Sequence, residues 1–174
     1  TRDVPVEVVA IANAEATETV DIQPRVGGEI VGVHFGEGTD VARGQLLFTI
    51  DPRPYRVELE RAEARLARDR ALLKKADEDV RRYEGLVQKE YVTREQYENA
   101  VAQADALRAT IRSGDADVER ARLELEYASI RSPISGRAGR VLGERGNQVR
   151  AGDDRTLVTL LATRPIEVAF AVPE

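Results

Sequence analysis

Residues 97–128 read YENAVAQADALRATIRSGDADVERARLELEYA. Apolar or small residues recur in this stretch at alternating steps of three and four, which is the a/d pattern of a heptad repeat. The recurring positions are Tyr97, Ala100, Ala104, Leu107, Ile111, Gly114, Val118, Ala121, Leu125 and Ala128. None of them is charged. The pattern predicts a long helix whose narrow apolar stripe has one partner face.

The preceding stretch carries the same rhythm and supplies that partner. Its positions are Leu59, Ala62, Leu66, Asp69, Leu73, Ala76, Val80, Tyr83 and Val87, and Asp69 is the single charged exception. Two arms of about 33–36 residues, each about 50 Å long, are expected to pack antiparallel as a coiled-coil hairpin over residues 52–128. The predicted contact seam contains Leu66, Leu73, Val80, Leu107, Ile111, Val118 and Leu125. A helical pair inside a larger bundle is the alternative.

The turn between the arms is indicated by TREQ at 93–96. This is a capping box, in which Thr93 accepts from the free amide of Gln96 and the Gln96 side chain bonds back to the first residue. The turn is therefore expected at about residues 89–92.

Glycine-punctuated apolar runs flank the helical segment on both sides, at 19–51 and 129–162. Gly28, Gly38 and Gly44 recur 108 positions later as Gly136, Gly146 and Gly152, and we interpret all six as turn positions. The repeat predicts one small β domain made of two similar halves of about four short strands each, split by the inserted hairpin. Chance similarity of glycine-rich strands is the alternative.

The two ends of the chain also have strand-like patterns. Residues 4–11 and 164–174 are rich in β-branched and alternating residues, and we expect them to pair with each other. Segments 1–18 and 163–174 would then form the root of a further, truncated β domain.

Composition excludes several functional classes. Charged residues make up 33% of the chain and the net charge is −5, which gives no reason to expect nucleic acid binding. There is no Cys and no Met, and only one His, His34, so a soft-metal site is not expected. Because a translated chain begins with Met, we expect a processed or excised segment that has lost any leader or anchor. No cofactor motif or catalytic constellation is present, and we expect no enzyme.

Four local strings resemble the membrane fusion proteins of the HlyD/AcrA/MexA-like family, the periplasmic adaptors of tripartite efflux pumps. They are GGEI at 27–30 with GTDVARGQLL at 38–47, IDPRPY at 50–55, RSPISGR at 131–137 and RPIEV at 164–168. The resemblance implies a mixed α and β, elongated, multi-domain fold. It comprises a lipoyl-like β-sandwich (19–51 and 129–162), the antiparallel coiled-coil α-hairpin (52–128) and a truncated β-barrel domain (1–18 and 163–174).

The resemblance also implies a function. The chain would be a periplasmic adaptor, anchored to the inner membrane by a part outside this segment. It would link an RND transporter of the inner membrane to a TolC-like outer-membrane channel and assemble as a ring, hexameric in the pump. By the family's tip signature, Arg82, Tyr83, Leu86 and Thr93 would contact the channel. On residue chemistry alone, the favoured interpretation would be a solvated Arg, a Leu at the edge of the seam and a helix cap.

Two other functions stay open at this point. One is a lipoyl or biotinyl carrier, or a substrate-binding module, of a multienzyme complex. A carrier needs a lysine between its β halves, but the lysines here, Lys74, Lys75 and Lys89, all lie in the helical segment. The other is an adaptor of an ABC-type exporter.

Overall fold

The computed structural model describes residues 12–152 and 155–170. Internal contacts divide the chain into two compact units. The first combines Thr1–Asp51 with Ser129–Glu174 and is built of strands, and the second, Pro52–Ala128, is helical.

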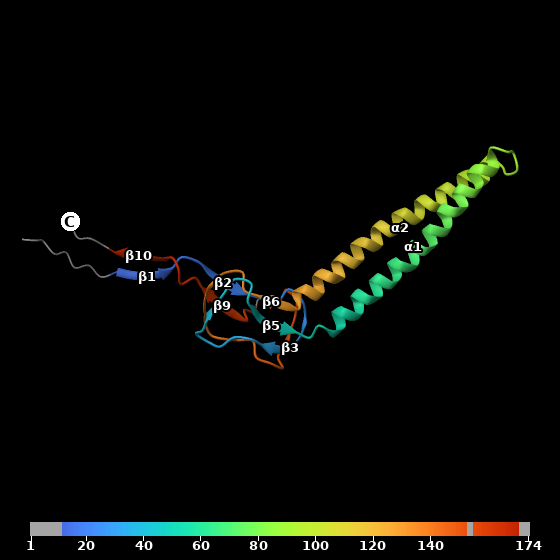
Figure 1. Ribbon diagram of the computed structural model, residues 1–174. Coiled ribbons are helices and arrows are strands. Elements are labelled where there is room, and N and C mark those ends of the chain that lie inside the picture. Colours follow the sequence, from blue (N-terminus) through green and yellow to red (C-terminus); the bar gives the residue numbers. More distant parts are fainter. Residues whose placement is uncertain (1–11, 153–154, 171–174) are drawn as a thin grey trace, which may run out of the picture. The chain divides into compact units, whose positions relative to one another are not determined.

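The helical unit consists of two long helices, α1 (Arg53–Val87) and α2 (Arg94–Tyr127), which lie side by side in Figure 1. Proline is tolerated at the start of α1 because the first-turn amides have no partner within the helix. Two ion pairs cross between the helices, Arg70 with Asp115 and Asp77 with Arg108. The later residue of α1, Asp77, pairs with the earlier residue of α2, Arg108. The two helices are therefore antiparallel.

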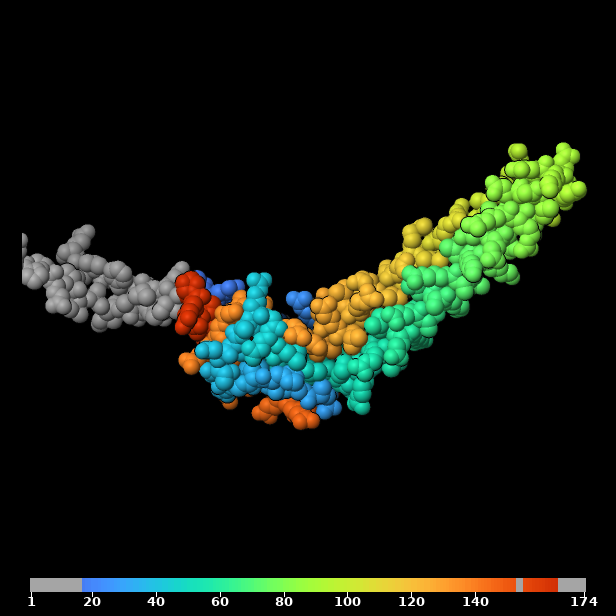
Figure 2. Space-filling view, viewed as in Figure 1, coloured from blue at the N-terminus to red at the C-terminus, as the bar shows by residue number. Residues whose placement is uncertain are grey.

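The predicted heptad positions are shielded from solvent in the structure. Leu66, Ala76, Ala104, Val118 and Ala121 are buried. Every other seam position of the two runs is half-buried or buried, including the predicted Leu73, Val80, Leu107, Ile111 and Leu125. The space-filling view shows the two helices in contact along their lengths, with no third element of this unit covering them (Figure 2). The unit therefore depends on one seam.

The β unit contains two four-stranded sheets and a two-stranded ribbon (Figure 1). The first half supplies β2 (Thr19–Ile22), β3 (Gly28–Val33), β4 (Asp40–Val41) and β5 (Leu46–Ile50). The second half supplies β6 (Ser129–Arg131), β7 (Gly136–Ala138), β8 (Gln148–Val149) and β9 (Val158–Leu161). Each half thus gives four short strands, as the sequence repeat predicts.

The two halves exchange strands. The sheet orders are β2-β9-β7-β4 and β6-β5-β3-β8, so each sheet takes two strands from each half. Replacing every strand by its counterpart in the repeat converts the first order into the second. The strand orders of the two sheets therefore follow the sequence repeat, which supports the prediction that segments 19–51 and 129–162 build one domain.

The core of the β unit is drawn from both halves. Its largest fully buried side chains are Ile30, Leu47, Phe48, Ile50, Leu157, Val158 and Leu160. The Phe35 ring meets Phe48 edge-on, with 5.2 Å between ring centroids. Burial of this apolar surface is the main term that stabilises the unit.

The six predicted turn glycines serve two different purposes. Gly28, Gly38, Gly44, Gly146 and Gly152 have positive φ angles, but Gly136 does not. Gly136 is instead required by space, because a Cβ there would overlap the Leu161 carbonyl oxygen of β9. Its repeat counterpart Gly28 is less crowded, because a Cβ there would meet only one side-chain atom, Ile50 Cγ2, at 2.6 Å.

The two-stranded ribbon pairs β1 (Ala12–Ala16) with β10 (Ile166–Phe170), antiparallel, from Ala12 opposite Phe170 to Ala16 opposite Ile166. The strand expected at residues 4–11 lies outside the described residues. The described partner of 166–170 is instead a segment for which the sequence pattern predicted no strand.

Candidate functional site

The connection between α1 and α2 is closed by backbone hydrogen bonds. Tyr91 N–H donates to the Leu86 carbonyl at 3.0 Å, and Glu90 N–H donates to the Val87 carbonyl at 3.1 Å. Glu90 has a φ of 61°. These two bonds around one left-handed residue are the Schellman arrangement that ends many helices. The tip therefore has a defined backbone.

The start of α2 is fixed by the capping box that the sequence predicts. The Gln96 amide donates to Thr93 Oγ1 at 3.2 Å, and the Thr93 amide donates to Gln96 Oε1 at 3.0 Å. Thr93 itself is exposed. Its hydroxyl is thus already used as a cap, while its methyl group and remaining surface face solvent.

The other predicted tip residues differ in exposure. The Arg82 side chain is 65% exposed and its Nη2 lies 3.3 Å from Asp79 Oδ1 on the same helix. Leu86 is half-buried, one helical turn further along the same face. Tyr83 is also half-buried and occupies a seam position, so its ring is placed to pack between the helices.

Sequence reasoning missed Tyr91, which is 75% exposed. An aromatic residue inside a short polar connection was the available signal. The sequence pattern predicts only a turn at residues 89–92, and it distinguishes neither Tyr91 nor the left-handed Glu90.

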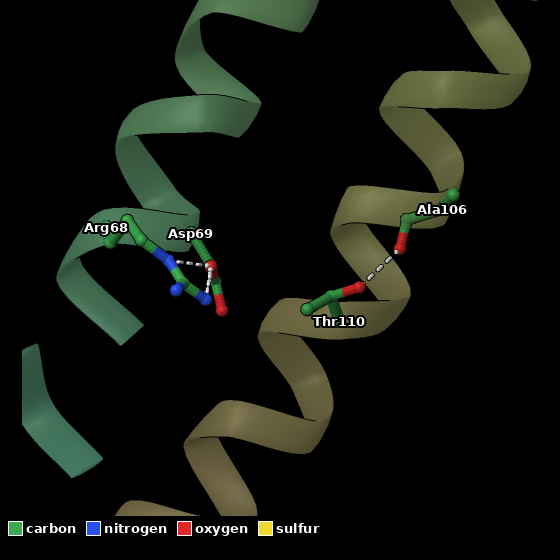
Figure 3. Close-up of polar contacts among 4 residues, drawn as sticks. All are labelled: Arg68, Asp69, Ala106 and Thr110. Atoms are coloured by element: carbon green, nitrogen blue, oxygen red, sulfur yellow. Dashed lines mark hydrogen bonds and ion pairs between the residues drawn. The ribbon is translucent and has the colours of Figure 1, made fainter. Parts of the chain in front are cut away.

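Asp69, the charged exception in the seam, is accommodated within its own helix. The residue is only 8% exposed. Arg68 donates to Asp69 Oδ1 from both Nε, at 2.9 Å, and Nη2, at 2.8 Å, and its own side chain is 68% exposed. Figure 3 shows the guanidinium folded onto the carboxylate, with Thr110 of α2 bonded to the Ala106 carbonyl.

A groove of about 210 Å³ lies beside Asp69. Its lining includes the small residues Ala62, Gly114 and Ala121, and its other lining residues are charged. We expect Asp69→Leu to raise the melting temperature of the helical unit, because Leu adds apolar burial while Arg68 stays solvated. The gain should be about 1 kcal/mol. Circular dichroism melts measure it, with Asp69→Asn as the control that removes charge at constant size. A lower melting temperature for Asp69→Leu would show that the carboxylate stabilises the pair.

The cross-helix ion pairs lie beside the seam. Arg70 Nη2 is 2.8 Å from Asp115 Oδ1, and Arg108 Nη2 is 2.6 Å from Asp77 Oδ1. The hydrogen bond to Asp105 and the charge of Asp77 raise the pKa of Arg108 above its usual value, and burial offsets part of this rise. The charge of Asp105 and the hydrogen bond to Asp77 add smaller increases. Arg108 therefore stays charged at any physiological pH.

The described residues contain no group of three or more His, Cys, Asp or Glu side chains placed to bind a metal ion. His34 Nε2 lies 2.8 Å from Thr49 Oγ1, a contact between neighbouring strand segments. Among the described helices, neither has the length and apolarity needed to cross a membrane. Within the helical unit, the tip is therefore the candidate functional site.

Comparison with known proteins places this architecture in a family. Residues 18–161 match the family model described as "RND MFP, barrel-sandwich hybrid domain". The chain therefore belongs to the RND membrane fusion protein family, of which it contains the barrel-sandwich hybrid domain.

Individual relatives support the same family assignment. Over 173 residues the chain is 40% identical to "Multidrug resistance protein MdtA" of Erwinia amylovora, and the match covers 99% of this chain and 43% of that protein. With MdtA of Escherichia coli it shares 35% identity over 171 residues, which is 98% of this chain and 41% of the relative. The chain thus spans about two fifths of the length of these relatives.

Solved structures share the fold. A MacA–MexA chimeric protein that contains the Pseudomonas aeruginosa MexA α-hairpin domain aligns with a TM-score of 0.62 and 27% identity, over 97% of this chain and 57% of that one. MacA of Actinobacillus actinomycetemcomitans aligns with a TM-score of 0.66 at 22% identity, over 94% of this chain and 56% of that one. The latter likeness concerns the fold alone.

Proposed function

We propose that this chain is the central part of a periplasmic adaptor of a multidrug efflux pump of the RND type. The β unit would be the lipoyl-like domain and Pro52–Ala128 the α-hairpin, while the β1–β10 ribbon would be the root of the β-barrel domain. Family membership and the MdtA relatives support the adaptor over a carrier module. In the complete protein an inner-membrane anchor would lie outside this segment.

The tip of the hairpin is the proposed contact with a TolC-like outer-membrane channel. The supporting observation is a tip with an ordered backbone that holds Arg82, Leu86 and Thr93 at one end of the helical pair, opposite Pro52 and Ala128. Thr93 already caps α2, so its removal would affect helix stability as well as docking. Tyr83 is part of the same proposed contact, and its half-buried heptad position would let the ring contribute to the seam as well.

The chemistry of the other two residues suits a protein partner. Among the described residues Arg82 pairs with Asp79 of its own helix and is 65% exposed, so its guanidinium can add bonds to carbonyl or carboxylate oxygens of a partner. Leu86 supplies an apolar contact beside it. The transporter side and the ring of adaptors, hexameric in the pump, would be formed by other surfaces of the protein.

The test is drug resistance in cells that lack their own adaptor and carry the full-length protein with Arg82→Ala and Leu86→Asp combined. We expect resistance to be lost, because loss of two contacts at about 1–2 kcal/mol each weakens association by about 30-fold or more. Protein level and thermal melt are measured alongside, to exclude unfolding.

A matched control combines Arg122→Ala with Leu123→Asp. Arg122 is likewise paired with an acid three residues earlier, Glu119, and Leu123 is 39% exposed, but both lie near the other end of α2. Retained resistance in this control would assign the effect to the tip. Full resistance in the Arg82, Leu86 variant would refute docking through the tip.

A further inference from the structure

Tyr91 is the most exposed large apolar residue among the residues described. It is 75% exposed, against 60% for Val57 and 47% for Leu72, which lie on α1, and less for Leu142, Leu123 and Leu161. Its position is the connection itself, at the end of the helical unit opposite Pro52 and Ala128. A single exposed ring is common on protein surfaces, but a partner that covered this one would gain the burial of a large apolar side chain.

The backbone around Tyr91 holds the ring in this exposed position. Leu86 O accepts the Tyr91 amide, and Glu90 adopts a left-handed φ of 61°. In a Schellman turn the residue in the place of Tyr91 often packs on the residue in the place of Leu86. Here most of the Tyr91 side chain is uncovered, although the backbone bonds of the turn are complete.

The occupied left-handed position is itself unusual. Glycine is the ordinary residue there, and a side chain with a Cβ is strained in that region. Strain that survives at an exposed turn is an observation from which a functional hypothesis can start. The left-handed conformation of Glu90 lowers local stability, and it fixes the backbone position of the next residue, Tyr91.

The charges around Tyr91 cancel. Lys89 stands beside Glu90, and Arg94 beside Glu95. A membrane surface selects a Lys- and Arg-rich face, which this tip lacks. The chemistry fits a protein surface instead, one with an apolar crevice for a ring and an acceptor oxygen at its end for the phenol hydroxyl.

We infer that Tyr91 is the aromatic anchor of the tip, inserting into an apolar crevice of the outer-membrane channel and setting which channel the adaptor accepts. The inference rests on the proposed function, that the tip docks to such a channel. It adds a residue that the tip signature does not contain, and it makes the contact largely independent of net charge.

The test measures binding of the full-length adaptor to a purified, detergent-solubilised TolC-type channel of Escherichia coli. Tyr91→Ala is expected to raise Kd at least about tenfold, as loss of an interface anchor does. Tyr91→Phe keeps the ring and should stay within about threefold of the wild type. Leu72→Ala, which removes another exposed apolar side chain on the same unit, should leave Kd unchanged.

The outcomes separate this inference from the proposed function. Wild-type affinity for Tyr91→Ala, together with loss of binding for the Arg82, Leu86 double variant, would overturn the role of Tyr91 and leave tip docking intact. Unchanged affinity in both variants would overturn both. If Tyr91→Ala instead reduces self-association in sedimentation experiments while channel binding is unchanged, the ring is a contact between copies and the inference is wrong.

Discussion

Gly136→Ala is expected to unfold the β unit under conditions in which the unaltered chain is folded. A Cβ at this position would overlap the Leu161 carbonyl oxygen, and it would lie 2.8 Å from the Leu161 carbonyl carbon and 3.1 Å from Ala162 Cα. All three are backbone atoms, so no side-chain rotation can relieve the overlap. Moving β9 away would break its pairing with β7, in which Arg137 faces Leu161. We expect a loss of about 3 kcal/mol or more.

Hydrogen exchange of the β-strand amides measures this loss separately from the helices. Gly38→Ala is the control, because no atom lies within 4 Å of its added Cβ and only the positive φ of 71° is unfavourable. That strain should cost about 1 kcal/mol. Equal losses in the two variants would mean that β7 and β9 do not approach as closely as the structure shows.

Gly136 illustrates what the sequence could and could not predict. Its place in the repeat, 108 positions after Gly28, identified it as a special glycine. The repeat alone suggested a turn with positive φ, which holds for Gly28 but not for Gly136. The actual reason, contact with Leu161, depends on the pairing of strands far apart in the chain, which no local pattern encodes.

The helical unit was easier to predict because its determinants are local. A 3.5-residue period fixes which residues meet, and the box of Thr93 with Gln96 fixes where α2 begins. The pattern also identified Asp69 as an exception. It did not predict that the adjacent Arg68 would bind the carboxylate, since neighbouring residues on a helix usually point in different directions.

The β1–β10 ribbon was harder to predict from the sequence. Residues 12–16 read ANAEA, and alanine and asparagine are depleted in strands. Pairing with β10 holds the backbone of this segment extended in spite of that composition. Where tertiary pairing overrides local preference, a search for β-branched runs does not find the segment.

Val118→Asp is expected to melt the helical unit while the β unit stays folded. Val118 is 8% exposed and lies in the only seam that holds α1 to α2 in the described structure. The substitution removes apolar burial and places a carboxylate between the helices, at a cost of about 3 kcal/mol or more. Most helical stability in proteins comes from packing of an apolar face, so the loss should propagate along the pair.

A carboxylate is tolerated at Asp69, so the comparison between the two seam positions is instructive. Asp69 follows Arg68, which donates two hydrogen bonds to it. Position 118 has an acid on each side in the sequence, Asp117 and Glu119, so no adjacent arginine can donate to a new carboxylate as Arg68 does to Asp69. The same side chain should therefore be far more costly at 118.

The measurement is the helical circular dichroism signal during thermal unfolding, with Leu123→Asp as the control on the same helix. Leu123 is 39% exposed, so its replacement should change stability by less than about 1 kcal/mol. The strand amides of the β unit should keep their protection from exchange in both variants, because the core around Phe48 and Leu157 is built without the helices. If Val118→Asp melts no earlier than Leu123→Asp, the seam does not hold the pair together and the helices must be stabilised by another surface.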